Sequence, residues 1–224
     1  MLDVLFIGAH PDDESCICGT LIKAVKAGKK VGILTLTKGE SCGYATGEER
    51  EAEMEKAVAV IGADYFKHLD FLDSGLRFND EMVAAIIDVL VETRPRTVIT
   101  LYPVDCHPDH IAVSQSVDSA LFLAHLKKHI GEARWDFMQV FYVSVNPAAN
   151  SKDPDIIIDV TDVIDEKHEA ANCHASQGVA DSLIRLAGYY GEKSGFSYGE
   201  ALYKGVTRQY PIKLKSFIPL LLED

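Results

Sequence analysis

The sequence predicts an α/β fold, with a single Rossmann-like, doubly wound and mainly parallel sheet that carries helices on both faces. Short runs of almost continuously apolar residues alternate along the chain with amphipathic helical patterns. Such runs are typical of parallel strands that are covered on both sides by helices. No Pro/Ser-rich linker, internal repeat or low-complexity tract interrupts the 224 residues. We therefore expect one domain over residues 1–224.

The first half of the chain supplies four of the expected strands. They are the apolar or β-branched runs at residues 4–8, 31–37, 65–72 and 97–101. Helical patterns lie between these runs, at residues 20–29, 48–61 and 80–93. Gly62 follows the second helical pattern and Pro95 follows the third, and both residue types commonly end helices.

The second half of the chain continues the alternation with a helix, two strands and a mainly helical segment. These elements are expected at residues 110–128, 139–145, 155–160 and 162–186. Residues 38–47 are polar and rich in glycine, which predicts a loop. This loop is either a lid over a site or an ordinary connection, and the frequency with which loops carry function favours the lid.

The charge balance excludes several classes of partner. Asp and Glu number 34 against 22 Lys and Arg, a net charge of −12. Sequence-independent binding of nucleic acid or of anionic lipid needs the opposite sign. No apolar run reaches the roughly 20 residues of a membrane helix, and we expect no membrane insertion. A homo-oligomer is one arrangement that we consider.

Cysteine usage and the start of the chain predict a cytoplasmic protein. The five cysteines are an odd number at a low density for a disulfide scaffold. The first residues lack the basic start and apolar stretch of a signal peptide. A reducing compartment follows from both observations.

A polar run with metal-binding potential follows the first strand. It reads Ala9-His10-Pro11-Asp12-Asp13-Glu14 and lies where open parallel sheets bind ligands, beyond the carboxyl end of a strand. Adjacent Asp12 and Asp13 point in different directions, so one can bind a metal beside His10 while the other serves as a base. The alternative is a helix N-cap, which acidic residues also favour, and this run alone leaves both open.

A second polar run, Asp105-Cys106-His107-Pro108-Asp109-His110, follows the strand at residues 97–101. In the common doubly wound order the first strand lies beside the fourth, so the two runs meet in one crevice. Two histidines and one carboxylate form a catalytic zinc set that leaves a position open. The pair of runs therefore predicts a metal site more strongly than either run does alone.

These runs resemble the two signatures of PIG-L/LmbE N-acetylglucosaminyl deacetylases. The resemblance rests on His10-Pro11-Asp12-Asp13-Glu14, with Gly19 following, and on His107-Pro108-Asp109-His110. Residues 36–40 and Arg50-x-x-Glu53 resemble the family's connecting pattern. Residues 155–160 and 195–200 resemble weaker C-terminal features of relatives in bacillithiol or mycothiol assembly.

The resemblance implies zinc-dependent removal of the N-acetyl group from a small N-acetylglucosamine conjugate, with release of acetate and a free amine. Zn²⁺ is the implied cofactor, and another divalent ion such as Fe²⁺ is an alternative. The resemblance implies that His10, Asp13 and His110 bind the metal and that Asp12 is the general base. It implies that His107 stabilises the oxyanion, with Asp109 supporting a histidine. Arg50 is implied to bind the sugar. Tyr198 is a further substrate-binding candidate, for which simple packing is the alternative.

Two other functions fit parts of the sequence. A non-haem Fe(II) enzyme uses the same two-histidine, one-carboxylate set, but usually on a jelly-roll-type β scaffold. A non-catalytic sugar- or nucleotide-binding module would leave Asp12 and His107 without a role, and no Gly-x-Gly-x-x-Gly follows the first strand. His168 and His174 fall in a long polar helical pattern, where we expect them to be solvated.

Overall fold

Within residues 1–131, 135 and 139–205, which the computed structural model describes, seven strands form one sheet in the order β3-β2-β1-β4-β5-β7-β6. The strands are β1 (Val4–Gly8), β2 (Val31–Thr35), β3 (Tyr65–His68), β4 (Thr97–Leu101), β5 (Gln139–Val143), β6 (Ile156–Asp159) and β7 (Gly199–Lys204). Residues 206–224, which the predicted domain includes, lie outside the described residues.

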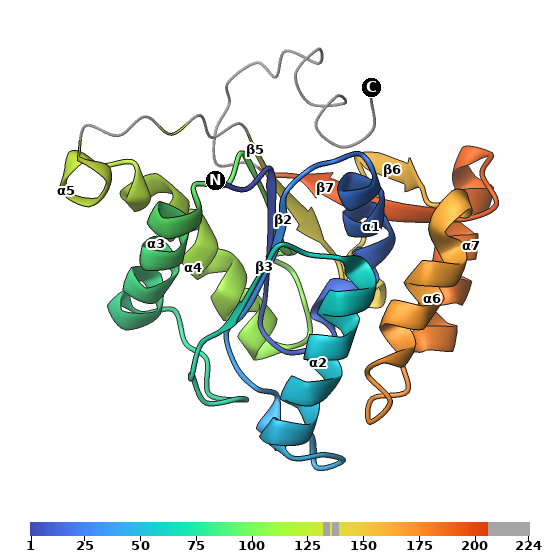
Figure 1. Cartoon of the computed structure of the whole chain (residues 1–224), viewed down its shortest axis with the longest axis horizontal. Coiled ribbons are helices and arrows are strands. Elements are labelled where there is room, and N and C mark those ends of the chain that lie inside the picture. The colour runs from blue at the N-terminus through green and yellow to red at the C-terminus, as the bar shows by residue number, and fades with distance from the viewer. Residues whose placement is uncertain (132–134, 136–138, 206–224) are drawn as a thin grey trace.

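Helices cover both faces of the sheet (Figure 1). The α-helices are α1 (Cys18–Lys26), α2 (Gly47–Ile61), α3 (Asp80–Thr93), α4 (Pro108–Ala124), α5 (Lys127–Ile130), α6 (Ile164–Asn172) and α7 (Ala180–Ser194). Short 3₁₀ turns occupy Asp13–Cys16, Glu40–Cys42, Pro147–Ala149 and Thr161–Val163. Helices α3 and α4 pack on one side, and α1, α2, α6 and α7 group on the other. No helix of the described residues is both long and apolar enough to span a bilayer.

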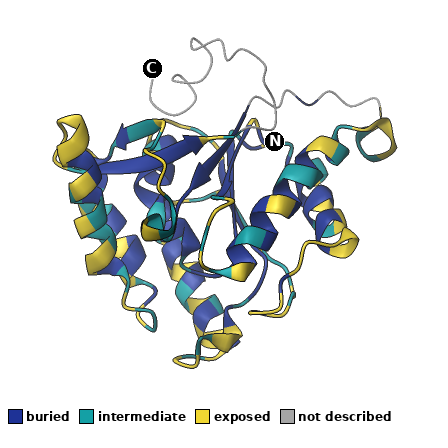
Figure 2. Cartoon of the chain, turned by 180° about the vertical axis from the view of Figure 1, so that it is seen from behind, coloured by how far each residue is buried: buried dark blue, intermediate teal, exposed yellow. Residues whose placement is uncertain are grey.

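The structure confirms the predicted α/β class and strand order. Strand β1 pairs in parallel with β2 on one side and with β4 on the other, so the first strand does lie beside the fourth. Every position of β1, β2, β4 and β5 is buried. Figure 2 shows the same layering, with buried strands inside and the exposed residues on the outer sides of the helices. Burial on both faces explains why these strands are continuously apolar in sequence.

Three elements differ from the sequence-based expectation. Strand β3 ends at His68 rather than at residue 72. The helical segment expected at 162–186 is two helices, α6 and α7, with a break at residues 173–179. Strand β7 was not predicted, and it runs antiparallel between β5 and β6. Its partner strands lie about 40 to 60 residues upstream, so the local sequence pattern does not predict this strand.

Glu200 of β7 ties this late strand to the start of α1. Its carboxylate accepts the backbone N–H groups of Gly19 at 2.9 Å and Thr20 at 2.7 Å. It also pairs with Lys167 of α6 at 2.7 Å, and both side chains are buried. A Cβ on Gly19 would lie 2.9 Å from the Glu200 carboxylate, so this close approach requires glycine. The α1 N-terminus, just beyond the His10–Glu14 run, is thus fixed by residues of α6 and β7.

We predict that Lys167→Met lowers the free energy of unfolding by about 3–5 kcal/mol, because it leaves the Glu200 carboxylate buried without its counter-charge. Urea unfolding of the variant and the wild type measures this difference. Lys23→Met is the matched control, since Lys23 pairs with the exposed Asp162 and should change stability by less than about 1 kcal/mol. Equal losses in the two variants would contradict the importance of the buried pair.

Candidate metal centre

The carboxylate of Asp13 is held in place by the turn that follows β1. Its Oδ2 atom accepts the backbone N–H of Ala9 at 2.8 Å and that of His10 at 2.9 Å. These bonds use one carboxylate oxygen and leave Oδ1 directed at His110, whose Nε2 lies 3.2 Å away. Asp13 is 2% exposed, so a buried carboxylate of the first polar run faces a histidine of the second.

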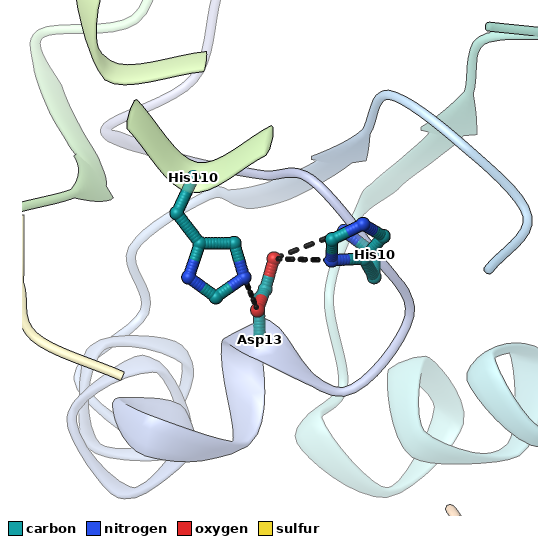
Figure 3. A group of neighbouring side chains, drawn as sticks. All are labelled: His10, Asp13 and His110. Atoms are coloured by element: carbon teal, nitrogen blue, oxygen red, sulfur yellow. Dashed lines mark hydrogen bonds and ion pairs between the residues drawn. The ribbon is translucent and has the colours of Figure 1, made fainter. Parts of the chain in front are cut away.

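His10, Asp13 and His110 come together in the structure, as Figure 3 shows. One ligand atom from each residue lies within 4.8 Å of the others, and all three residues are buried. His10 projects from the turn after β1, while His110 lies in the first turn of α4. The parallel pairing of β1 with β4 brings these two turns to the same edge of the sheet.

In each histidine of this cluster, the ring nitrogen that points away from Asp13 contacts a second carboxylate. His110 Nδ1 lies 3.1 Å from Asp105 Oδ2. His10 Nε2 lies 3.1 Å from Asp73 Oδ1 and 3.3 Å from Asp109 Oδ2. Such contacts orient metal-binding histidines and fix which nitrogen carries the proton. They leave His10 Nδ1 and His110 Nε2 facing Asp13, so the donors fit a single divalent cation.

Two opposing effects set the pKa values in this cluster, namely burial of the ionisable groups and their pairing with neighbouring charges. Burial disfavours the charged imidazoles, but the surrounding carboxylates outweigh it and raise the pKa of His10 to about 9 and that of His110 to about 10. Burial likewise acts against ionisation of Asp13, yet the two histidines lower its pKa. A cation at this position would take over the pairing and displace those protons.

Asp12 lies beside the cluster in an unusual backbone conformation. Its φ of 111° is in a region that residues other than glycine seldom occupy. Burial and the neighbouring Asp13 raise the pKa of the Asp12 carboxyl to about 7, although Arg50 acts in the opposite direction. The Asp12 side chain is 21% exposed, and it lines a cavity of about 370 Å³ together with the three clustered residues.

Arg50 also lines this cavity, but its guanidinium is occupied by the protein. It donates to the carbonyl of Gly39 at 3.0 Å and to that of Pro11, and it lies 3.2 Å from Asp12 Oδ1. Arg50 is 3% exposed. The expectation that Arg50 faces the sugar stays a prediction: Arg50 lies on the cavity, and its guanidinium is directed at Asp12 and at the loop after β2.

His107 and Asp109 lie at the same site with partners that the sequence did not predict. The Asp109 carboxylate faces His10 and accepts the Ser74 N–H at 2.8 Å. His107 Nδ1 instead accepts the backbone N–H of Asp109 at 3.2 Å. Burial and the neighbouring histidines lower the pKa of His107. The histidine that the Asp109 carboxylate contacts is therefore His10 rather than His107.

Tyr198 is not brought to the cavity. The residues that line the cavity do not include it, and its backbone N–H donates to Thr161 Oγ1 at 3.1 Å. Its ring packs against the core near α7. Tyr198 was considered for substrate binding or for packing, and its observed contacts are those of a packing residue.

Sequence reasoning missed Asp73 and misplaced His174. Asp73 follows β3 at the same edge of the sheet as both polar runs, and that position was the one available signal. His174 was expected to be solvated, but it is fully buried and lies 2.6 Å from Glu14. Burial disfavours its charged form, yet Glu14 outweighs burial and raises the pKa of His174. His168 is partly exposed, as expected.

The sequence matches the model of a known protein family. The model of the PIG-L family, described as GlcNAc-PI de-N-acetylase, matches residues 5–121, just over half of the chain. The chain belongs to the PIG-L family. Both polar runs fall within the matched segment, while β7 and His174 lie beyond it.

Relatives of this PIG-L protein include named deacetylases. The diacetylchitobiose deacetylase of Thermococcus kodakarensis is 27% identical over 89% of this chain and 81% of its own. The 1D-myo-inositol 2-acetamido-2-deoxy-alpha-D-glucopyranoside deacetylase of Rhodococcus jostii is also 27% identical, over 78% of this chain and 81% of its own.

Solved structures share the fold along nearly the whole chain. The conserved protein TT1542 of Thermus thermophilus has a TM-score of 0.83 and 32% identity, over 94% of this chain and 98% of its own. GalB of Pseudomonas putida, a 4-carboxy-2-hydroxymuconate hydratase, has a TM-score of 0.84 and 21% identity, over 94% and 99%. Since a hydratase shares this PIG-L fold, the reaction has to be argued from the site.

We predict that Asp12→Asn stabilises the metal-free protein in a pH-dependent way. The folded pKa of about 7 exceeds the unfolded value of about 3.9, so the folded protein keeps a proton that the unfolded chain has released. Wild-type stability therefore falls as the pH rises through this window. The advantage of the Asn variant should grow to roughly 1–3 kcal/mol by pH 8.

Urea unfolding of chelator-treated protein between about pH 4 and pH 8 measures this advantage. Asp70→Asn is the control, because the Asp70 side chain is 89% exposed and should give no such trend. A difference between Asp12→Asn and the wild type that stays constant across the range would show that Asp12 has an ordinary pKa.

Proposed function

We propose that this protein is a metal-dependent N-deacetylase that hydrolyses the acetamido group of a small N-acetylglucosamine-containing substrate, within one domain over residues 1–224. The observation that carries the proposal is the convergence of His10, Asp13 and His110, with Asp12 adjacent to them on a common cavity. Membership of the PIG-L family and the named activities of its relatives support it.

The donor set favours a catalytic ion, with zinc as the first candidate and Fe²⁺ as the alternative. Two imidazoles and one carboxylate leave room for water and substrate. Bound there, the ion would lower the pKa of water to about 7 and polarise the acetyl carbonyl. Asp105 and Asp109 would orient His110 and His10 toward it.

Asp12 is the proposed general base. Its carboxylate takes the proton from the attacking water and later delivers it to the departing amine, which leaves as the free amino sugar beside acetate. Arg50 holds Asp12 Oδ1 at 3.2 Å and so orients this carboxylate. Because Asp13 is fixed by backbone N–H groups, the two adjacent carboxylates have separate roles.

His107 is the proposed donor to the developing oxyanion. Its Nδ1 atom accepts a backbone N–H, so a neutral imidazole carries its proton on Nε2. The ring lies 4.8 Å from His10 and 4.6 Å from His110, between centroids. A neutral Nε2–H beside the cluster can donate to the carbonyl oxygen as charge develops on it.

The cavity suits a hydrophilic substrate. Beyond the cluster, hydrogen-bonding side chains line it, among them Ser41, Asp73, Asn146 and Gln177. Sugar hydroxyls can pair with such groups. We place the reaction in the cytoplasm, which agrees with five unpaired cysteines, all in the described residues.

Acetate release tests the proposal. We expect zinc-loaded protein to release acetate from at least one of N,N′-diacetylchitobiose and the inositol and malate conjugates of N-acetylglucosamine. Asp12→Asn should retain the ion and lose about 10²- to 10⁴-fold in turnover, because asparagine cannot accept the proton.

Asp70→Asn is the matched control and should keep wild-type turnover, since Asp70 is exposed and outside the cavity. No acetate from any substrate would contradict the proposal and favour a binding module or a different reaction. Turnover near that of the wild type in Asp12→Asn would assign Asp12 to a purely structural role.

A further inference from the structure

A buried histidine–glutamate pair lies next to the Asp12 turn. His174 Nε2 and Glu14 Oε1 are 2.6 Å apart, and neither side chain is exposed. The mechanism proposed above uses neither residue. Burying a carboxylate is costly unless it is paired and hydrogen-bonded, so the contacts of Glu14 indicate what the pair supports.

Glu14 contacts the backbone of Asp12. Its Oε2 atom accepts the Asp12 N–H at 3.1 Å, while Oε1 receives Ser15 Oγ at 3.1 Å and His174. The two neighbouring bonds are local, within two residues of Glu14 in sequence. Within the described part of the chain, only His174, which is 160 residues away, ties this carboxylate to the rest of the fold.

The backbone held by Glu14 is strained. Asp12 adopts φ 111° and ψ −21°, and such a conformation persists in a residue other than glycine only where the surroundings impose it. The Asp12 carbonyl accepts the Ser15 N–H at 3.0 Å, and Arg50 holds the side chain. Among the described residues, Glu14 is the partner of the Asp12 N–H.

The backbone segment that carries His174 is anchored in the break between α6 and α7. Ser176 donates its backbone N–H and its hydroxyl to the two carboxylate oxygens of Glu53 on α2, at 2.8 and 2.7 Å. The carbonyl of His174 accepts the Gln177 N–H at 3.0 Å. The held segment thus places the imidazole so that Nε2 faces the Glu14 carboxylate, which can only accept when it is ionised.

We propose that His174 is a positioning residue that acts through Glu14 to hold the Asp12 backbone in its left-handed conformation, with the carboxylate aimed into the cavity. This inference rests on the proposed function of Asp12 as general base. It gives a role in catalysis to the C-terminal half of the chain, which contributes none of the proposed metal ligands.

The test compares His174→Leu, which removes the donor, with His174→Gln, whose amide N–H can still reach Glu14. Turnover is measured on the substrate that the wild type deacetylates, together with zinc per chain. Because misplacement by about 1 Å can cost 10²-fold, we expect His174→Leu to lose roughly 10- to 100-fold in kcat with KM within about threefold. Zinc should stay at one ion per chain, and His174→Gln should recover most of the loss.

His168→Leu is the matched control, since His168 lies on α6, is partly exposed and pairs only with Asp181 in the described structure. It should keep wild-type kcat. Wild-type kcat in folded, zinc-loaded His174→Leu would overturn the proposal, and so would a loss of kcat that parallels loss of zinc. If His174→Leu does not fold, His174→Asn, which is too short to reach Glu14, is judged by the same criteria.

Crystal structures of the wild type and His174→Leu give a measure that does not depend on turnover. We expect Asp12 to leave the positive-φ region in the variant, and an unchanged φ would contradict the proposal. If the wild type releases no acetate, the proposed function fails, whereas this backbone comparison still tests the role of His174.

Discussion

The parallel pairing of β1 with β4 is the constraint on which the candidate site depends. The register places Val4 opposite Thr97 and Ile7 opposite Thr100, so the two strands end side by side. The turn after β1 and the first turn of α4 are then neighbours, although about 100 residues separate them in sequence. A shift of this register would separate His110 from Asp13 while leaving both local turns intact.

Around this junction, buried carboxylates and histidines alternate, so that each histidine lies between two carboxylates. Asp13 faces two histidines, each of which faces a further carboxylate, Asp105 or Asp109. Carboxylates outnumber histidines in this arrangement. Buried carboxylates are costly unless positive charge balances them, so the arrangement would favour binding of a cation. The same logic applies beneath Asp12, where Glu14 is stabilised by His174. The described site is therefore a buried cluster in which histidines and carboxylates alternate.

The sequence predicts those features of the fold and the site that depend on local residue patterns. Apolar runs and turn residues indicated the sheet, and the position of two polar runs after the first and fourth strands indicated their meeting. Asp73 and His174 escaped prediction because their burial arises from packing between distant elements. The break at 173–179 and strand β7 have the same origin. The sequence also did not specify which histidine Asp109 contacts, because the direction of this side chain depends on the start of α4.

The most direct test of the central claim is the number of zinc ions bound per chain, measured by elemental analysis of purified wild type, His110→Ala and His107→Ala. The account predicts one ion in the wild type and in His107→Ala, because His107 lies beside the ion without binding it. It predicts almost none in His110→Ala, which removes a ligand. Equal loss of zinc in both variants, or full retention in His110→Ala, would contradict a centre built from His10, Asp13 and His110.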